Sequence, residues 1–375
     1  MRIGIDGRVL DRKITGTGRY LQNLLLELPN NHDDKNDYIL FTNTKQSFDS
    51  KFFTIVNVKE SFIPMKLYSP IWFNYELPKL LKEYSIDILL APNIIVPLVD
   101  IGKTKIITVV HDIIPRIFPE YYPYFYKKYL SIFLPPTLKK ADIIITVSEQ
   151  SKEDLVDYYN VPEEKLRIVY NSSATIFNTS YSKEVVKKML EEKLSIKQEY
   201  LLYVGVIDKR KNVLGLIKIL DLIKKQESKL ILVVVGEAGY ISKEFFEEIN
   251  KRKDIIKHFN YVDDETLTLL YSNAFAFLFP SYYEGFGIPP LEAMQSGIPV
   301  LSSNKSSLKE VVGHGGLIHD PDNHSAFAND ILKLENDSDF YNGVIKKGLE
   351  QSRKFDIKKM ASRLVNIINE IQLDK

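Results

Sequence analysis

The sequence contains no cysteine among its 375 residues. Disulfide bonds, thiolate nucleophiles, iron–sulfur clusters and cysteine-ligated zinc sites are therefore excluded. An excess of one charge is also lacking, because 50 Lys and Arg residues stand against 49 Asp and Glu residues and give a formal net charge of +1. The large basic excess typical of nucleic-acid-binding proteins is thus absent, and we expect no nucleic acid among the partners.

Apolar runs long enough to span a membrane are missing as well, since the stretch 104–110 is broken at once by His111. The N-terminus, Met1–Asp6, carries charge too early for a secretory signal. We therefore expect a soluble, cytoplasmic protein. The Tyr, Phe and Lys residues of 121–129 are compatible with peripheral contact with the inner face of the cytoplasmic membrane. The outer face of a packed helix is the simpler explanation.

Short apolar runs alternate with amphipathic stretches, which is typical of an α/β protein with parallel sheets. Several runs are continuous and β-branched, as expected of strands covered on both faces. The predicted strands are 2–6, 38–42, 86–91, 105–110, 143–147, 200–204, 230–235, 276–279 and 300–303. The predicted helices are 18–28, 148–159, 183–192, 213–226, 243–251, 264–272, 290–296 and 357–371.

A polar, turn-rich stretch separates two α/β blocks of similar size. We expect a first Rossmann-like domain over 1–172, a linker over 173–198 and a second Rossmann-like domain over 199–355, followed by a C-terminal helix within 356–375. The predicted architecture is two doubly wound domains that face each other across a cleft. Ligands of such domains lie at the carboxyl ends of the strands.

The segment 281–297 directly follows a predicted strand and is the most informative part of the sequence. Gly285 and Gly287 allow a tight turn with backbone N–H groups turned to a ligand, and the two prolines after them suit the start of a helix. A glycine turn that leads into a helix predicts a site for phosphate or another anion. Glu284 and Glu292 bracket it and fit as acceptors for sugar hydroxyl groups. The alternative is a capped surface turn with solvated glutamates.

The run from Glu284 to Glu292 resembles the E-x7-E motif of retaining glycosyltransferases of family 4, and the chain is most similar to their bacterial mannosyl- and rhamnosyltransferase-like branch. The resemblance implies the GT-B fold, with an acceptor-side first domain, a second domain that binds a nucleotide sugar, and a C-terminal helix that crosses back to the first domain. Further motifs occur in the family's order at 16–20, 111–115, 146–152, 169–171, 203–212, 279–281 and 303–307, with Glu310.

In the first domain, the resemblance places Gly16 and Gly18 near the donor diphosphate and the acceptor. A dinucleotide-binding fingerprint is a weak alternative, because Leu21 stands where G-x-G-x-x-G requires glycine. His111 ends a predicted strand, and the resemblance implies that it faces the donor sugar, although a lone histidine there is more often structural. The six scattered histidines have no metal-ligand spacing, so no metal is expected.

Arg210 and Lys211 follow the first strand of the second domain and could clamp a diphosphate as it leaves with growing negative charge. A solvated basic turn would explain an isolated pair equally well. In many relatives an arginine follows the glycine that ends this strand, whereas here Gly205 is followed by Val206. Asn212 also stands where glycine is frequent. The sequence therefore leaves open which of the two cations is the main clamp.

The resemblance implies further donor contacts in the glycine turn. The backbone N–H groups of Phe286, Gly287 and Ile288 would hold the diphosphate, Glu292 the ribose, and Glu284 the hydroxyl groups of the donor sugar. Because no other carboxylate is placed near the anomeric carbon and no cysteine exists, we expect front-face attack rather than a covalent enzyme intermediate.

The resemblance implies a retaining glycosyltransferase, and together with these features it predicts an enzyme that needs no metal and no cofactor. It would move a hexose from a nucleotide diphosphate sugar to a hydroxyl of a glycan or lipid-linked acceptor, in bacterial surface polysaccharide or glycoconjugate synthesis. GDP-mannose is the first expectation for the donor. UDP-, dTDP- and ADP-sugars stay open, because the stretch with Val262 matches a segment that contacts the base through its main chain. The alternatives are a GT-B-fold nucleotide-sugar epimerase or hydrolase, and a non-catalytic sugar-nucleotide-binding subunit.

Overall fold

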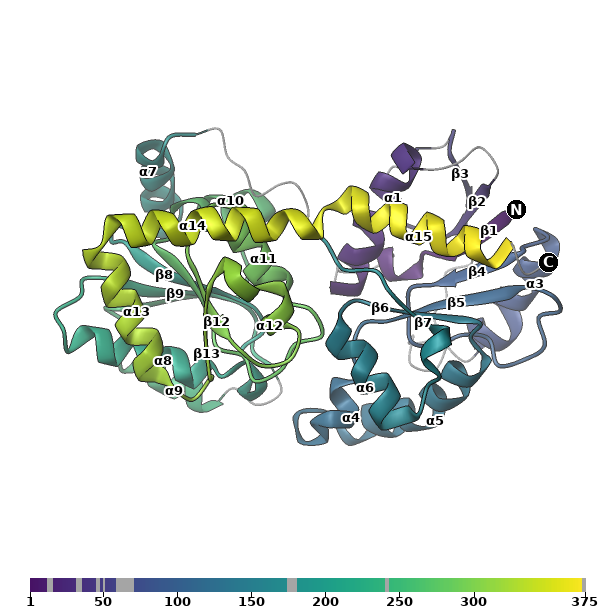
Figure 1. The fold of residues 1–375 in the computed structure, drawn as a ribbon, viewed down its shortest axis with the longest axis horizontal. Helices are drawn as coiled ribbons and strands as arrows, with labels where there is room; N and C mark the ends of the chain where they lie inside the picture. The colour runs from purple at the N-terminus through teal and green to yellow at the C-terminus, as the bar shows by residue number, and fades with distance from the viewer. Residues whose placement is uncertain are drawn as a thin grey trace. The chain divides into compact units, whose positions relative to one another are not determined.

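The computed structural model describes residues 1–11, 16–31, 36–44, 48–49, 51–58, 71–173, 181–239 and 243–372. The chain divides into two compact units (Figure 1). The first is coloured purple to teal, with the yellow C-terminal helix, and the second is coloured teal to yellow. The first unit consists of Met1–Ile117, Tyr124–Ser172 and Ile357–Lys375. The second consists of Phe118–Pro123 and Ser173–Asp356.

The first unit is built on a parallel sheet of seven strands in the order β3-β2-β1-β4-β5-β6-β7. Its inner strands are almost wholly buried, as their continuous apolar runs require. The strands are β1 (Arg2–Asp6), β2 (Asp37–Phe41), β3 (Phe53–Val56), β4 (Ile88–Ala91), β5 (Lys105–Val110), β6 (Ile143–Thr146) and β7 (Leu166–Ile168).

Helices cover this sheet. They are α1 (Gly16–Asn31), α3 (Leu77–Glu83), α4 (Ile114–Ile117), α5 (Tyr124–Lys140), α6 (Glu149–Tyr159) and α15 (Ile357–Gln372), with the shorter turns η1 (Arg8–Leu10), η2 (Trp72–Glu76) and η4 (Glu163–Lys165). Local sequence sets the ends of α6: the side chain of Ser148 accepts the N–H of Ser151, and Asn160 ends the helix in the left-handed conformation.

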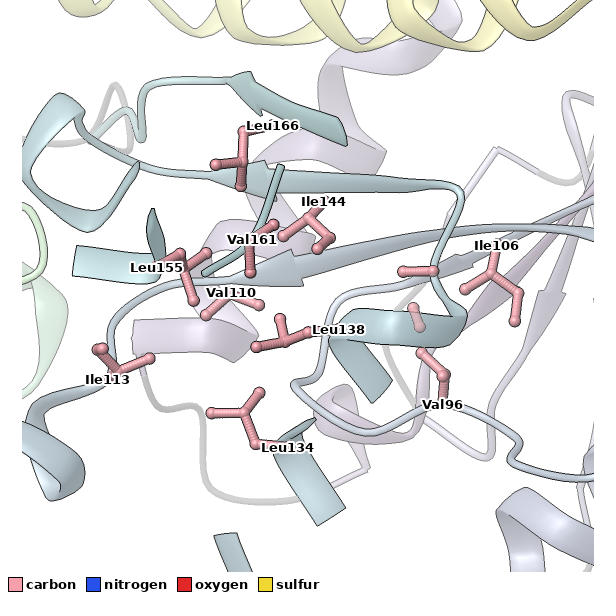
Figure 2. Packing of buried hydrophobic residues seen from close by; sticks show 12 residues of the cluster. Val96, Ile106, Val110, Ile113, Leu134, Leu138, Ile144, Leu155, Val161 and Leu166 are labelled. Carbon is pink, nitrogen blue, oxygen red and sulfur yellow. The ribbon is translucent and has the colours of Figure 1, made fainter. Parts of the chain in front are cut away.

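Figure 2 shows the core between the sheet and two of these helices. Leu134 and Leu138 of α5 lie in one cluster with Val110 of β5, Ile144 of β6 and Leu155 of α6. Residues 124–129 of the aromatic and basic segment singled out in the sequence form the first turns of α5, and none of them is fully buried. The helix is buried through Leu130, Leu134, Thr137 and Leu138 farther along.

The C-terminal helix α15 belongs to the first unit, where it packs against α1. The apolar side chains of one helical stripe, Leu364 and Ile368 among them, are fully buried. Polar contacts fix its position: the Ser362 hydroxyl donates to Asn31 Oδ1 at 2.7 Å, and Arg167 of β7 pairs with Glu370 at 3.1 Å.

The second unit has a parallel sheet of six strands in the order β10-β9-β8-β11-β12-β13. Its central strands are again buried along nearly their whole length. The strands are β8 (Tyr200–Val204), β9 (Ile231–Val235), β10 (Ile256–Phe259), β11 (Ala276–Phe279), β12 (Val300–Ser303) and β13 (Leu317–His319).

The helices of the second unit are α7 (Lys183–Leu194), α8 (Val213–Lys224), α9 (Lys243–Asn250), α10 (Asp264–Asn273), α11 (Ile288–Gln295), α12 (Leu308–Val311), α13 (His324–Asn336) and α14 (Ser338–Ser352), with η3 (Pro119–Tyr121), η6 (Lys209–Lys211), η7 (Gly313–Gly315) and η8 (Arg353–Phe355). Helix α7 falls within the linker expected over 173–198, yet it packs against α10 and buries Val186 and Leu190. It is an integral helix of this unit.

All nine predicted strands are present, with ends that differ by at most two residues. The four strands that the sequence did not reveal, β3, β7, β10 and β13, are the four edge strands of the two sheets. Each has two or three residues that are only partly buried or exposed. An edge strand lacks the continuous apolar run of a central strand, because one of its sides faces away from the sheet.

No helix in the described part of the chain is long and apolar enough to cross a membrane.

Replacing Leu364 by alanine is expected to destabilise the first unit by about 2–5 kcal/mol, because a fully buried leucine leaves a cavity between α15 and α1. The single tryptophan, Trp72, is buried in the same unit, so urea unfolding followed by its fluorescence reports this unit. The matched control is Arg363→Ala, at the exposed neighbouring position, with an expected change within about 0.5 kcal/mol. Equal stability of the two variants would contradict the docking of α15.

Candidate active site

The glycine turn of the second unit lies between β11 and α11, as its sequence predicted. Gly287 is the N-cap of α11 and has φ 117°, in the left-handed region that favours glycine. A Cβ atom there would also lie 2.8 Å from Leu308 Cδ2, too close for a real contact. Prolines occupy the first turn of α11, which begins at Ile288, two residues earlier than predicted. The N-terminus of a helix thus follows the turn, and its first N–H groups have no partner within the helix.

Two serines after β12 fix the shape of this turn. The backbone N–H of Glu284 donates to Ser306 Oγ at 2.9 Å. The Ser307 hydroxyl is shared between the carbonyl oxygens of Glu284 at 2.8 Å and Phe286 at 2.7 Å. The motifs 303–307 and 281–297 therefore form one structural element, because the serine hydroxyls of the first make hydrogen bonds with backbone groups of the turn in the second.

Arg210, Lys211 and Glu284 meet at this turn. Lys211 Nζ lies 2.8 Å from Glu284 Oε1, and Arg210 Nη1 lies 3.3 Å from Glu284 Oε2. Arg210 also donates to the carbonyl of Tyr283. The three side chains are each only 11% exposed, so two cations share one carboxylate inside the protein. These three groups together carry a net charge of +1, and the carboxylate of Asp208 acts on Lys211 as well.

This environment changes the protonation of the cluster. Burial alone would raise the pKa of Glu284, but the charges of Lys211 and Arg210 outweigh it and hold that pKa below its ordinary value. Burial lowers the pKa of Lys211, and Glu284 opposes this shift without reversing it. Glu284 is therefore an ionised hydrogen-bond acceptor at neutral pH, and its negative charge is stabilised by the two cations rather than by solvent.

The turn that carries the two cations is held by its neighbours. The Asp208 side chain accepts the N–H of Arg210 at 3.0 Å, and the carbonyl of Arg210 accepts the N–H of Tyr282 at 2.9 Å. Asn212 has φ 50°, a left-handed conformation that asparagine tolerates better than most residues, and its side chain caps α8. This explains why asparagine can stand where glycine is frequent.

Gly205 and Val206, at the end of β8, carry no positive charge. A Cβ at Gly205, whose φ is 153°, would lie 3.5 Å from Lys211 Nζ and 3.2 Å from the Tyr203 hydroxyl, which leaves little room for a side chain. Val206, which follows Gly205, is 47% exposed and brings no charge. In this chain Arg210 and Lys211 provide the buried positive charge of the turn, while Lys209 on the same turn is exposed.

Glu292 lies on α11 and is only 5% exposed. The hydroxyl of Tyr271 on α10 donates to its Oε2 at 2.8 Å. Sequence reasoning missed Tyr271, because a tyrosine inside an amphipathic helix gives no signal beyond core packing. This contact orients the carboxylate that the sequence assigned to the ribose.

Val262 lies in the loop between β10 and α10 and is half-buried. This loop follows the carboxyl end of β10, as the turns with Lys211 and Gly287 follow the carboxyl ends of β8 and β11. Since all strands of the sheet are parallel, these loops share one edge of the sheet.

In the first unit, His111 follows β5 and packs edge-to-face against Tyr20 of α1, with ring centroids 4.9 Å apart. Burial lowers the pKa of His111 to about 4, although a hydrogen bond with the backbone of Pro92 opposes the shift. The imidazole is therefore neutral at physiological pH. Asp112 Oδ1 accepts the N–H of Ile114 at 3.1 Å and caps a turn.

Gly16 is the first residue of α1, and Gly18 is buried one half-turn later. The start of α1 precedes the predicted one by two residues, and the residues 12–15 before it lie outside the described part. Tyr20 stands on the same helix, so the structure brings the motif 16–20 to His111. Within the described ranges, no group of three or more His, Asp or Glu side chains could hold a metal ion.

Comparison with known proteins identifies the family of this chain. Residues 186–351 match the family profile described as "Glycosyl transferases group 1", and residues 14–172 match "Glycosyltransferase Family 4". The chain is 30% identical over 289 residues to the O-antigen chain mannosyltransferase B of Escherichia coli, covering 76% of this chain and 75% of that protein. It is 31% identical to the O-antigen chain mannosyltransferase RfbU of Salmonella typhimurium, covering 71% and 70%. The chain belongs to the family 4 glycosyltransferases.

Solved structures agree on the fold of this glycosyltransferase. Sucrose-phosphate synthase from Thermosynechococcus elongatus superposes with a TM-score of 0.76 and 17% identity over the whole of both chains. The glycosyltransferase WaaG superposes with a TM-score of 0.72 and 17% identity, covering 98% of this chain and 99% of that one. The predicted GT-B fold of two parallel-sheet Rossmann-like domains is thereby confirmed.

In this glycosyltransferase, Glu284→Gln is expected to destabilise the second unit by about 3–5 kcal/mol at neutral pH, because two buried cations lose their counter-charge. The folded-state pKa of Glu284 is lowered, so its stabilisation is present above the ordinary value of 4.5 and is lost as the pH falls through the lowered pKa. The advantage of the wild type over the variant should shrink accordingly in acid. Calorimetry at several pH values measures both effects.

The control is Glu247→Gln on the same unit, where an exposed glutamate pairs with Lys243 at 3.7 Å on the surface. Its effect should stay below about 1 kcal/mol. If the two variants were equally stable at neutral pH, the buried charge cluster would not contribute to folding.

Proposed function

We propose that this glycosyltransferase transfers a hexose, with mannose as the first candidate, from a nucleotide diphosphate sugar to a hydroxyl of a glycan or lipid-linked saccharide. The observation that carries the proposal is the buried cluster of Arg210, Lys211 and Glu284 beside the glycine turn that opens α11. A positively charged cluster next to a helix N-terminus suits a diphosphate, while an ionised carboxylate suits sugar hydroxyls. The similarity to two O-antigen mannosyltransferases supports mannose and a role in bacterial surface polysaccharide synthesis.

GDP-mannose is the proposed donor, and UDP-, dTDP- and ADP-sugars are the alternatives. A structure of similar fold, Anabaena HepE in complex with UDP-glucose, is 17% identical to this chain, so it supports a nucleotide sugar without choosing the base. A thermal-shift screen of the four classes of donor tests the assignment, because a ligand that binds the native state raises the melting temperature. The proposal expects the largest shift with GDP-mannose, followed by mannosyl transfer to an acceptor. Turnover of the donor without an acceptor would favour an epimerase or hydrolase instead.

The proposed chemistry relies on charge placed before the reaction. As the bond between the sugar and the diphosphate breaks, negative charge grows on the diphosphate, and Lys211 and Arg210 would stabilise it together with the N–H groups of Phe286, Gly287 and Ile288. The two cations already stand in position and need no rearrangement of solvent. Glu284 would accept hydrogen bonds from hydroxyl groups of the donor sugar.

The pairing of Glu284 with two cations supports retention through front-face attack. A carboxylate whose oxygens lie 2.8 Å from Lys211 and 3.3 Å from Arg210 is a weakened nucleophile, because its charge is neutralised by its partners. We therefore propose that Glu284 orients the donor sugar and does not attack it. The leaving phosphate would accept the proton of the acceptor hydroxyl. His111, neutral because of its lowered pKa, would contact the donor sugar by hydrogen bonding rather than as a charged acid.

Lys211→Ala and Arg210→Ala are expected to lower kcat/KM. If the replaced residue clamps the diphosphate, the decrease should correspond to a loss of about 2–4 kcal/mol of transition-state stabilisation. The larger loss identifies the main clamp. Lys209→Ala serves as control, because Lys209 lies on the same turn η6 but is exposed. Initial-rate measurements with a labelled donor give the values. If both variants turned over like the wild type, the clamp would be removed from the mechanism.

Glu292→Gln is expected to weaken nucleotide binding about tenfold to a hundredfold, since a hydrogen bond to a charged group is lost from a buried site. Tyr271→Phe should weaken binding less, because the carboxylate remains but loses its positioning partner. Titration calorimetry with the nucleoside diphosphate measures both, and the exposed Glu350→Gln is the control. An affinity unchanged in Glu292→Gln would refute the ribose assignment.

Transfer should continue at full rate in excess EDTA, because Arg210 and Lys211 supply the positive charge that a divalent ion would otherwise provide. The measurement compares initial rates with EDTA, with added magnesium and with added manganese. Strict dependence on either ion would contradict this account of the diphosphate site.

A further inference from the structure

A pocket lies where three neighbouring strands of the first unit begin. Arg2 and Asp37 are the first residues of β1 and β2 and stand opposite each other in the sheet, and Phe52 directly precedes β3. The pocket has a volume of about 410 Å³, which suits a small molecule. We call it the amino-edge pocket, and it is lined by Arg2, Asn36, Asp37, Tyr38, Ile39, Lys51, Phe52, Thr54 and Tyr84.

The amino-edge pocket is separate from the residues that we assign to glycosyl transfer. His111 follows the carboxyl end of β5, and the strands of this sheet run parallel, so the pocket lies at the opposite edge of the sheet. Strand β1 alone extends about 13 Å from Arg2 to Asp6. The pocket adjoins the C-terminal helix instead, because Asn36 Nδ2 donates to Asn369 Oδ1 of α15 at 3.5 Å. None of the roles proposed above uses it.

Aromatic rings make up much of the lining. The ring of Tyr38 stacks on that of Phe52, with centroids 4.9 Å apart and ring planes at 26°. Tyr38 and Ile39 are buried, whereas Phe52 and Tyr84 are only partly buried and keep part of their surface open. A planar ring of a ligand can stack on such side chains.

Two cations also line the pocket. Arg2 Nη1 donates to the carbonyl of Tyr84 at 3.1 Å, which holds the guanidinium in place. Lys51 is exposed, and within the described ranges neither cation forms an ion pair with a carboxylate. Asp37 is the one carboxylate of the lining, and Asp87 accepts the backbone N–H of Arg2 at 3.0 Å. The fixed guanidinium therefore keeps further N–H groups for an acidic group of a ligand.

We propose that the amino-edge pocket binds a nucleoside phosphate. The phosphate would pair with Arg2 and Lys51, and the base would stack on the aromatic side chains. Asp37 would accept hydrogen bonds from hydroxyl or amino groups of the ligand. An anion without a ring would leave the aromatic side chains unused, and a neutral ring would leave the cations unused. The proposal does not depend on the transfer of a hexose.

Three ligands that share parts of one molecule test the proposal. Adenosine monophosphate has the ring and the phosphate, ribose 5-phosphate lacks the ring, and adenosine lacks the phosphate. Urea unfolding of the full chain, followed by the fluorescence of Trp72, reports the first unit. We expect adenosine monophosphate to raise the urea midpoint, because it binds the native state. By titration calorimetry, the other two should bind about tenfold more weakly or worse.

Substitutions then assign the binding to this pocket. Arg2→Gln should weaken the binding of adenosine monophosphate about tenfold to a hundredfold, since a charged hydrogen-bond donor is lost, and Lys51→Gln should weaken it less. Thr54→Phe fills the pocket from an exposed position on β3 and removes no charge, so it should abolish the midpoint shift. The control is Lys103→Gln, at an exposed position of the same unit outside the pocket. Glu292→Gln, in the second unit, should leave the shift intact.

The proposal is wrong if none of the ligands shifts the midpoint, or if Thr54→Phe binds adenosine monophosphate like the wild type. A shift that is lost in Glu292→Gln but kept in Thr54→Phe would place the ligand in the donor site instead. Equal affinity for ribose 5-phosphate would show a general anion site. Equal affinity for adenosine would show that Arg2 and Lys51 take no part in binding.

Discussion

Glu284 is held by Lys211 at 2.8 Å and by Arg210 at 3.3 Å in a place that water barely reaches, and much of the second unit is arranged around this contact. Two cations and one carboxylate cannot be buried together unless their remaining hydrogen bonds are satisfied. The backbone carbonyl of Tyr283 accepts from Arg210, and Ser306 and Ser307 hold the turn that carries Glu284. The motifs 203–212, 281–297 and 303–307 therefore depend on one another.

The cluster also explains how one site can be ready for an anion before the anion arrives. Lys211 and Arg210 together carry more charge than Glu284 neutralises, and burial lowers the pKa of Lys211 without the carboxylate fully restoring it. A diphosphate would supply the missing negative charge. The excess positive charge, which destabilises the folded protein, would therefore favour binding of the diphosphate. Family membership establishes glycosyl transfer, while stabilisation of the leaving group is the role that we propose for this local charge.

The first unit contributes a buried histidine and a packed helical layer. His111 is kept neutral by burial against Tyr20, and α15 closes the helical layer through Leu364 and Ile368. Together these features describe a unit with a packed interior and a neutral histidine at the end of β5.

Sequence alone determined the nine central strands, the E-x7-E turn and the family, because central parallel strands must be apolar throughout and a glycine turn before a helix leaves a local signature. The four edge strands gave no such signature, since their exposure breaks the apolar run. Only the tertiary structure showed that Arg210 and Lys211 both reach Glu284, that Tyr271 holds Glu292, and that α7 packs into the second unit. The contacts of Glu292 with Tyr271, and of Glu284 with Lys211 and Arg210, join residues 21, 73 and 74 positions apart in the chain. Which residues so far apart come together is set by the order of the strands and the packing of the helices, and no local sequence pattern records either.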